Sequence, residues 1–317
     1  MHSQKLEFGY SKKIIKNKSF WLESNHNGLD YDKAMFHFLI EKGDSKKNIF
    51  FDYGLKLNLS SKKKINKHLI DQGFLKFKKN IFNLSFGRFN QNVSSESKLL
   101  SSGSLAISNN ARKIPSIEIG IDNFEPIVFR KFNFQLKGSL SHGWLNKGQY
   151  IEAPFLHQKN LYFKKIMKSG HSISIGIVHL AIWGGETLVY GKQPDKLSDY
   201  LRIFFLRPGS RNHLEQERIN TLGNHLGIWD FLYEKEKNDK KFRLYYQHPF
   251  EDESGARWLL NRFDGLYGIE LISKNNGYIN QFLYEYINTM NQSGSLGATD
   301  STYGWDNYYN HYIYQSG

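Results

Sequence analysis

Cysteine is absent from the 317 residues, and this absence excludes disulfides, zinc–thiolate sites and thiol catalysis. No stretch approaches the ~18 consecutive apolar residues that a membrane-spanning helix needs. The first residues, Met1 to Lys5, lead directly into a strand-like segment without the apolar region of a signal peptide. The sequence therefore predicts no membrane-spanning helix and no thiol-based site.

Aromatic residues are abundant, because the chain has 24 Phe and 19 Tyr, yet its mean hydropathy is −0.57. This pairing is unusual for a soluble domain. It is typical of a transmembrane barrel, whose strands show an apolar face to lipid and a polar face to the lumen. The net charge of +13 indicates either simple solubility or attraction to an anionic polymer, such as nucleic acid, lipopolysaccharide or acidic polysaccharide.

Apolar and polar residues alternate over about a dozen positions from Ile49 to Ser60, and again from Lys131 to Leu140. A period of two predicts strands with one apolar face, and strands of soluble sandwiches are shorter, with a mode of about five or six residues. Lysine on the polar face favours a wet lumen over a closed apolar core. We expect Ile49, Phe51, Tyr53, Leu55, Leu57, Phe132, Phe134, Leu136 and Leu140 to face lipid, and Lys56, Asn58, Asn133 and Gln135 to face inward.

The segment from Arg243 to Gly294 contains no helical spacing and is predicted to form consecutive antiparallel strands joined by turns. Pro194–Phe205 is the best helix candidate. It belongs to an insertion at about 186–218, which we expect to fold into a barrel mouth or to pack as a plug.

Four arginines gather in or beside this insertion. Arginine pairs bidentately with carboxylate or phosphate groups, and acidic groups are frequent on surface polysaccharides. The alternative is that these arginines pair with acids inside the barrel and hold a plug. The candidate ligand-binding residues are Arg202, Arg207, Arg211 and Arg218.

Carboxylates cluster at Glu251, Asp252 and Glu253, with Asp264 close in sequence. Such a group invites a glycosidase interpretation, or a site for a hard cation such as calcium. Adjacent residues on a strand point to opposite faces, so the three neighbouring acids cannot all converge, and we favour structural roles. The 12 histidines show no metal-binding spacing, and we predict neither a metal nor a cofactor. The basic run at 61–64 favours a solvated loop, and no nucleic-acid partner is expected.

Several longer segments resemble the Wzi-type capsule assembly proteins, in the order in which that family has them. They include GSLAISNNARKIP (103–115), GIVHLAIWGG (176–185), LGNHLGIWDF (222–231), YQHPFEDESG (246–255) and EYINTMNQSG (285–294), with FWLESNHNG (20–28) and GRFNQ (87–91) nearer the start. The resemblance implies an outer-membrane β-barrel of about eighteen strands. It also implies a lectin-like, non-catalytic protein that holds capsular or other surface polysaccharide on the cell. The family has a signal peptide and continues beyond the last motif, so we expect this chain to be truncated at both ends.

Together these observations predict an all-β chain: one large antiparallel transmembrane β-barrel domain over 1–317 with a short helical insertion. The expected location is the outer membrane of a Gram-negative bacterium. The expected partners are capsular or extracellular polysaccharide, outer-membrane lipid and lipopolysaccharide. Two alternatives stay open, namely a glycan-active hydrolase that uses Glu251, Glu253 or Asp264, and a passive porin.

Overall fold

The structure is a computed structural model, and it describes residues 3–11, 35–43, 49–60, 70–91, 93–127, 133–148, 150–251, 256–257, 261–275, 277–292 and 307–315. Phe132, Glu253 and the motif at 20–28 lie outside the described residues.

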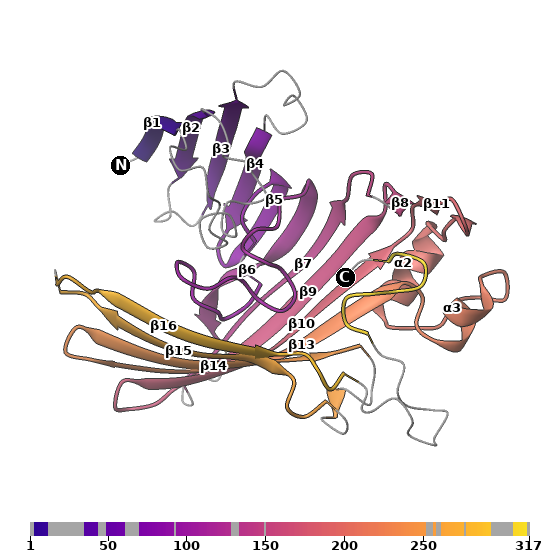
Figure 1. The fold of residues 1–317 in the computed structure, drawn as a ribbon. Coiled ribbons are helices and arrows are strands. Elements are labelled where there is room, and N and C mark those ends of the chain that lie inside the picture. Colours follow the sequence, from indigo (N-terminus) through magenta and orange to yellow (C-terminus); the bar gives the residue numbers. More distant parts are fainter. Residues whose placement is uncertain are drawn as a thin grey trace, which may run out of the picture.

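The chain forms one antiparallel sheet of 13 strands, in which each strand pairs with its neighbours in sequence order (Figure 1). The strands are β1 (Ser3–Ser11), β2 (Met35–Gly43), β3 (Ile49–Ser60), β4 (Ile70–Lys79), β5 (Phe82–Arg88), β6 (Ser116–Pro126), β7 (Phe134–Trp144), β9 (Phe155–Ile166), β10 (His171–Trp183), β13 (Asn224–Lys237), β14 (Lys240–Phe250), β15 (Gly265–Ser273) and β16 (Gln281–Asn288). A small sheet contains β8 (Ile151–Glu152), β11 (Glu186–Thr187) and β12 (Gly191–Lys192), and two short helices follow it, α2 (Leu197–Phe204) and α3 (Glu215–Ile219). The large sheet curves into a barrel wall whose end strands, among the described residues, are β1 and β16.

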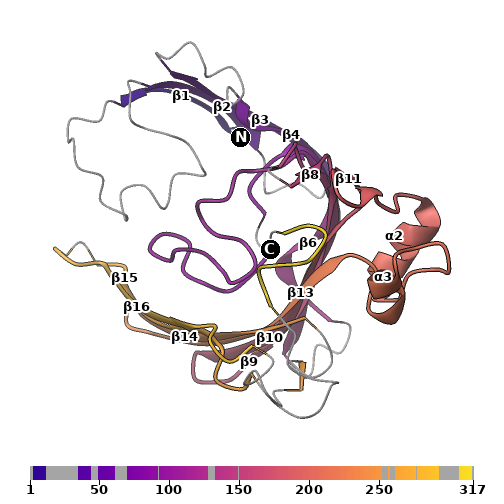
Figure 2. The ribbon, with the colours of Figure 1, turned by 45° about the vertical axis from the view of Figure 1, so that its right-hand side comes forward.

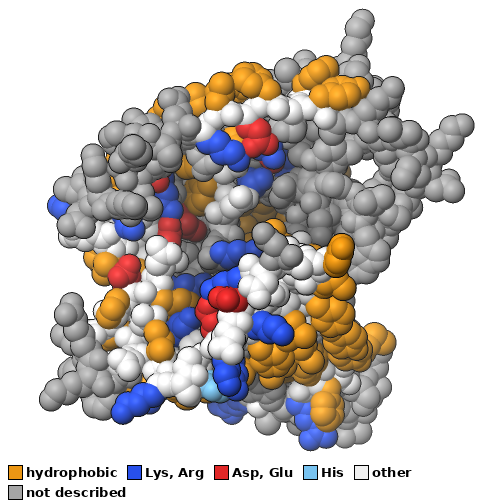
Figure 3. Space-filling model, turned by 90° about the vertical axis from the view of Figure 1, so that its left-hand side faces the viewer, with side chains coloured by type: hydrophobic (Ala, Val, Ile, Leu, Met, Phe, Trp, Pro, Cys, Tyr) orange, Lys and Arg blue, Asp and Glu red, His pale blue; other side chains and the backbone are white. Residues whose placement is uncertain are grey.

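The wall is apolar on its convex face and polar on its concave face. Phe51, Leu75 and Phe163 are exposed on the outside, whereas Asn58 and Asp230 are buried on the inside. A soluble protein buries the opposite set, because apolar side chains gain free energy when they leave water. The exposed apolar residues of the wall include Leu6, Phe8, Phe36, Phe77, Leu84, Ile117, Ile119, Leu161, Ile173, Ile175, Leu244, Ile269, Leu271, Phe282, Tyr284 and Tyr286. Figure 3 looks into the hollow, where Lys, Arg, Asp and Glu side chains gather, while hydrophobic side chains lie around it. The pattern is that of a transmembrane barrel.

The alternation of apolar and polar residues correctly predicts, for most of the residues concerned, which face of the wall they occupy. Phe51 and Phe134 are exposed on the outside, and Asn58 is buried on the inside. Lys56 also points inward, where its Nζ lies 3.3 Å from Oδ2 of Asp71. The prediction is wrong for Asn133. This residue is exposed in the turn before β7 and has a left-handed backbone (φ 52), because the strand begins one residue later.

The two ends of the barrel differ in the length of their connections. Short turns join β4 to β5, β9 to β10 and β13 to β14 at one end. In the last of these, Asn238 and Asp239 both have positive φ, as a two-residue type I′ hairpin requires. The connections at the other end are long, and one of them carries α2 and α3. In outer-membrane barrels the short turns face the periplasm and the long loops face outward.

Two segments occupy the concave side of the wall (Figure 2). We call residues 93–113, between β5 and β6, the lumen segment, and residues 307–315 the tail. Val93 and Leu105 of the lumen segment belong to a buried cluster with Tyr162, Ile228 and Tyr245 of the wall. The main apolar core therefore lies inside the barrel, between the lumen segment and the wall.

The insertion that contains α2 lies elsewhere. Ile203 of α2 is fully buried against Ala181 and Trp183, which are on the convex face of β10, and against Leu222. The expectation that this insertion enters the mouth or forms a plug is therefore wrong for α2, which covers the outside of the wall (Figure 2). Leu214, just before α3, instead packs against Ile313 and Tyr314 of the tail. None of the described helices is long and apolar enough to span a membrane.

Candidate functional site

The candidate site begins with α2 and the outward side chains beneath it. Four histidines at the long-loop ends of the strands, His142, His157, His179 and His225, face outward there. Nε2 of His179 lies 2.8 Å from Nδ1 of His225, and the rings of His142 and His157 contact the ring of Tyr200 from α2. Within the described residues, no group of three or more His, Cys, Asp or Glu side chains could hold a metal. His142 and His157 therefore form part of the surface on which α2 packs.

The four arginines predicted as ligand contacts all lie in this insertion, on its surface. Arg207, Arg211 and Arg218 are exposed, and Arg202 is half-buried on α2. Nη1 of Arg202 donates to the carbonyl of Pro208 at 2.7 Å. Among the described residues none of the four forms an ion pair, so they do not hold a plug through buried acids. Three of the four arginines therefore lie exposed on the surface of the insertion.

Serines of the lumen segment are tied to carboxylates of the wall. The backbone N–H of Ser95 donates to Oδ2 of Asp230 at 2.8 Å, and the hydroxyl of Tyr162 donates to the same oxygen at 2.7 Å. The hydroxyl of Ser101 donates to Oε1 of Glu285 at 2.7 Å. Hydrogen bonds to ionised groups are the stronger kind, at about 1.5–3 kcal/mol each. The lumen segment is therefore fixed across the channel from β13 to β16.

The tail joins the lumen segment to the insertion. The hydroxyl of Tyr309 donates to the carbonyl of Leu105 at 3.2 Å, and the hydroxyl of Tyr312 donates to Oε1 of Glu217 in α3 at 2.7 Å. Burial raises the pKa of Glu217, although the hydrogen bond from Tyr312 opposes this shift. Burial also lowers the pKa of His311 to about 4. Its Nε2 lies 3.9 Å from Oε1 of Glu217.

Two of the carboxylates considered for glycosidase chemistry, Glu251 and Asp264, lie among the described residues, and both accept hydrogen bonds from other parts of the chain. Asp264 is fully buried, and its two oxygens accept four hydrogen bonds: two from the backbone and side-chain nitrogens of Asn291 at 2.9 Å, one from the backbone of Gln292 at 2.6 Å, and one from Tyr308 at 2.9 Å. Glu251 accepts the backbone N–H of Asn307 at 3.0 Å. Asp264 therefore holds the connection after β16 and the tail in place.

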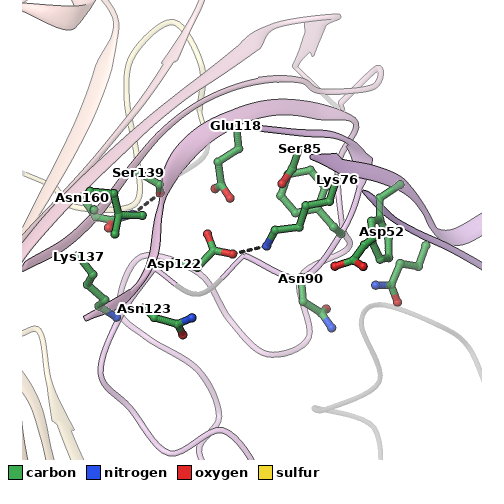
Figure 4. A pocket seen from close by; sticks show the side chains of 15 residues that line it. Asp52, Lys76, Ser85, Asn90, Glu118, Asp122, Asn123, Lys137, Ser139 and Asn160 are labelled. Carbon is green, nitrogen blue, oxygen red and sulfur yellow. Dashed lines mark hydrogen bonds and ion pairs between the residues drawn. The ribbon is translucent and has the colours of Figure 1, made fainter. Parts of the chain in front are cut away.

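A polar cavity of about 360 Å³ opens on the concave face of β3 to β9 (Figure 4). Lys76 and Asp122 form an ion pair within it, and Nδ2 of Asn160 donates to Oγ of Ser139 at 2.7 Å. Gln91 donates to Oγ of Ser141 at 3.0 Å nearby. The cavity offers the donors and acceptors that hydroxyl groups of a small polar ligand could use.

A model of the family "Capsule assembly protein Wzi" matches residues 20–317. The chain belongs to the Wzi family. Among curated proteins, none matches the chain. Members of the Wzi family are capsule assembly proteins.

Solved structures of outer-membrane barrels are similar to the chain at low sequence identity. Wzi of Escherichia coli, an outer membrane protein involved in Group 1 capsule assembly and a carbohydrate-binding β-barrel, is 11% identical. The match covers 90% of this chain and 80% of that one, with a TM-score of 0.45. A mutant of the Rh. blastica porin is 10% identical, with coverage of 90% and 98% and a TM-score of 0.32.

Sequence reasoning missed the role of the lumen segment. The available signal was the set of acids on inward positions of distant strands, Asp230, Glu270 and Glu285, which could accept from serines. It also did not predict that α2 covers the convex face of the wall. The apolar face is interrupted by three outward-facing histidines, His142, His157 and His179. Their polarity indicates that this part of the convex face is covered by protein and not by lipid.

Proposed function

We propose that this protein is an outer-membrane β-barrel that binds capsular or other surface polysaccharide and holds it at the cell surface, lectin-like and without catalysis. Membership of the Wzi family supports the class of ligand. The location in a Gram-negative outer membrane is part of the proposal. It is supported by the convex wall of exposed Phe, Leu, Ile and Tyr side chains.

The observation that carries the proposal is the surface of the insertion, where Arg202, Arg207, Arg211 and Arg218 lie without ion pairs among the described residues. Exposed guanidinium groups can pair bidentately with carboxylates of an acidic polysaccharide. The long-loop end of the barrel, where α2 and α3 lie, is the end that faces the cell exterior in outer-membrane barrels. The net charge of +13 raises the local concentration of an anionic polymer.

Two alternative functions have less support. A passive porin needs a continuous aqueous path, but the lumen segment is hydrogen-bonded to Asp230 and Glu285 across the channel. A glycan hydrolase needs two carboxyl groups about 5–10 Å apart that converge on a cleft. Asp264 is fully buried and its oxygens are engaged by Asn291, Gln292 and Tyr308.

The test replaces Arg207 and Arg211 by Gln in the full-length protein and measures how much capsule the cells retain. We expect retention to fall, while heat-resistant folding of the barrel on a gel stays unchanged. A matched control replaces Lys168 and Lys237, exposed at the short-turn end, by Gln. This control removes the same charge but should leave retention intact. If retention survives the arginine replacements, this surface does not bind the polysaccharide.

A further inference from the structure

The helix α2 carries an apolar side that nothing in the described structure covers. Leu197, Leu201 and Phe205 are 75%, 48% and 60% exposed. They follow one another at intervals of four residues and therefore share one side of the helix. Ser198, which is exposed, and Arg202 lie on the adjacent side, whereas Ile203 faces the wall.

The C-terminus of α2 keeps a leucine where the backbone favours glycine. Leu206 has φ 53, its N–H donates to the carbonyl of Ile203 at 3.2 Å, and the N–H of Arg207 donates to that of Arg202 at 2.8 Å. These two bonds form a Schellman motif, in which the left-handed position is usually glycine. The side chain of Leu206 is 45% exposed. The left-handed backbone strains a residue other than glycine, and the Leu206 side chain gains little packing within the protein to offset that strain.

The helix lies directly beyond the lipid-facing part of the wall. Nζ of Lys159, on β9, hydrogen-bonds the carbonyl of Phe204 at the end of α2. Leu161, two residues further along the same face of β9, is 41% exposed among the apolar side chains of the wall. Two residues of a strand span about 7 Å. The C-terminal end of α2 therefore lies next to the apolar convex face.

We propose that α2 is an interfacial helix, which inserts Leu197, Leu201, Phe205 and Leu206 into the outer leaflet of the membrane and keeps Ser198 and Arg202 at the aqueous side. Lipid is the occupant that fits, because the neighbouring surface already faces lipid and because the helix is apolar on one side and polar on the next. This placement explains the leucine at the position that favours glycine, because the Leu206 side chain contacts the acyl chains and glycine has no side chain to do so. The arginines of the same insertion are thereby held at the membrane surface.

The absence of cysteine makes a direct depth measurement possible in the full-length protein. Leu201→Cys and the matched control Ser198→Cys are each labelled with an environment-sensitive fluorophore and reconstituted into phosphatidylcholine vesicles. Half of the preparations contain phosphatidylcholine brominated in its acyl chains, which quenches fluorophores in the hydrocarbon region. We expect the label at position 201 to lose most of its emission in brominated vesicles and the label at 198 to lose little. Aqueous iodide should quench them in the opposite order.

Equal quenching of the two labels by brominated lipid would overturn the proposal. Protection of position 201 from both quenchers would also overturn it, because a second copy of the chain would then cover the helix. Leu197→Cys, at the most exposed position of the apolar side, repeats the measurement if the change at 201 impairs folding. The proposal rests on the membrane placement of the barrel, but the vesicles contain no polysaccharide, so the result is independent of the proposed ligand.

Discussion

Replacement of Asp264 by Asn separates a structural carboxylate from a catalytic one. The substitution keeps the size of the side chain but converts one acceptor oxygen into a donor. Each oxygen of Asp264 accepts two hydrogen bonds, so Asn loses two of four and places its own N–H groups against donors. At about 1.5–3 kcal/mol for each bond to an ionised group, we expect a loss of about 3–6 kcal/mol in the free energy of unfolding. This loss is large beside the ~5–15 kcal/mol stability of a typical domain.

The assay is urea unfolding of the folded protein in lipid vesicles, with the midpoint and slope compared between variants. Tyr308→Phe removes one of the four bonds, and it also removes the bond that Nδ2 of Asn261 donates to the Tyr308 hydroxyl at 3.0 Å, so it should cost about 2–4.5 kcal/mol. Asp239→Asn is the matched control, because it makes the same substitution in an exposed hairpin turn that asparagine also favours. We expect it to change the stability by less than about 0.5 kcal/mol.

A result in which Asp264→Asn is as stable as the parent would refute this reasoning. Asp264 would then not carry the connection after β16, and its burial among donors would need another explanation. Loss of a glycan-cleaving activity at unchanged stability would favour the hydrolase alternative.

Three further outcomes follow from the barrel and its contents. Leu75→Arg on the convex face should cost about 2–4 kcal/mol, and Phe82→Arg beside a short turn less than about 1 kcal/mol, in urea unfolding; equal costs would contradict the membrane placement. Asp230→Asn weakens the attachment of the lumen segment and should raise conductance in planar bilayers, whereas an unchanged conductance would show that other contacts suffice. The folded-state pKa of His311 lies near 4, below its usual 6.5, so the stability of the tail is fully present above 6.5 and is lost as pH falls toward 4. Glu217 has a raised pKa, so its contribution to stability has the opposite pH dependence. Because the acid sensitivity comes from His311, hydrogen exchange of the tail should lose it in His311→Asn, and acid sensitivity that persists would assign it to another group.

The strands and their faces could be predicted from sequence, because side chains on a strand alternate between two environments. The alternation in the run that includes Phe51, Leu55 and Asn58 predicts lipid on one side of the strand and a polar lumen on the other. The failure at Asn133 has a local cause, since alternation does not say where a turn ends. Thirteen strands make up the wall among the described residues, against about eighteen expected from the resemblance to the Wzi family.

The candidate site was less predictable, because its parts come from distant regions. The helix α2 could be predicted from the helical spacing of Leu197, Leu201 and Phe204. Periodicity does not predict, however, which side of a barrel a helix covers. The hydrogen bonds between serines and wall acids leave no periodic signal. Asp264 looked like a candidate catalyst because sequence shows a carboxylate but not the four donors around it.

The span of the contacts that fix the lumen segment has a consequence for the order of assembly. Ser95 is bonded to a residue 135 positions later, and Ser101 to one 184 positions later. Closing loops of that length costs conformational entropy before any bond forms. The segment cannot find its acceptors until β13 and then β16 have joined the sheet. The nascent barrel is therefore open along its axis while most of the wall is built, and it becomes obstructed only when the last strands arrive.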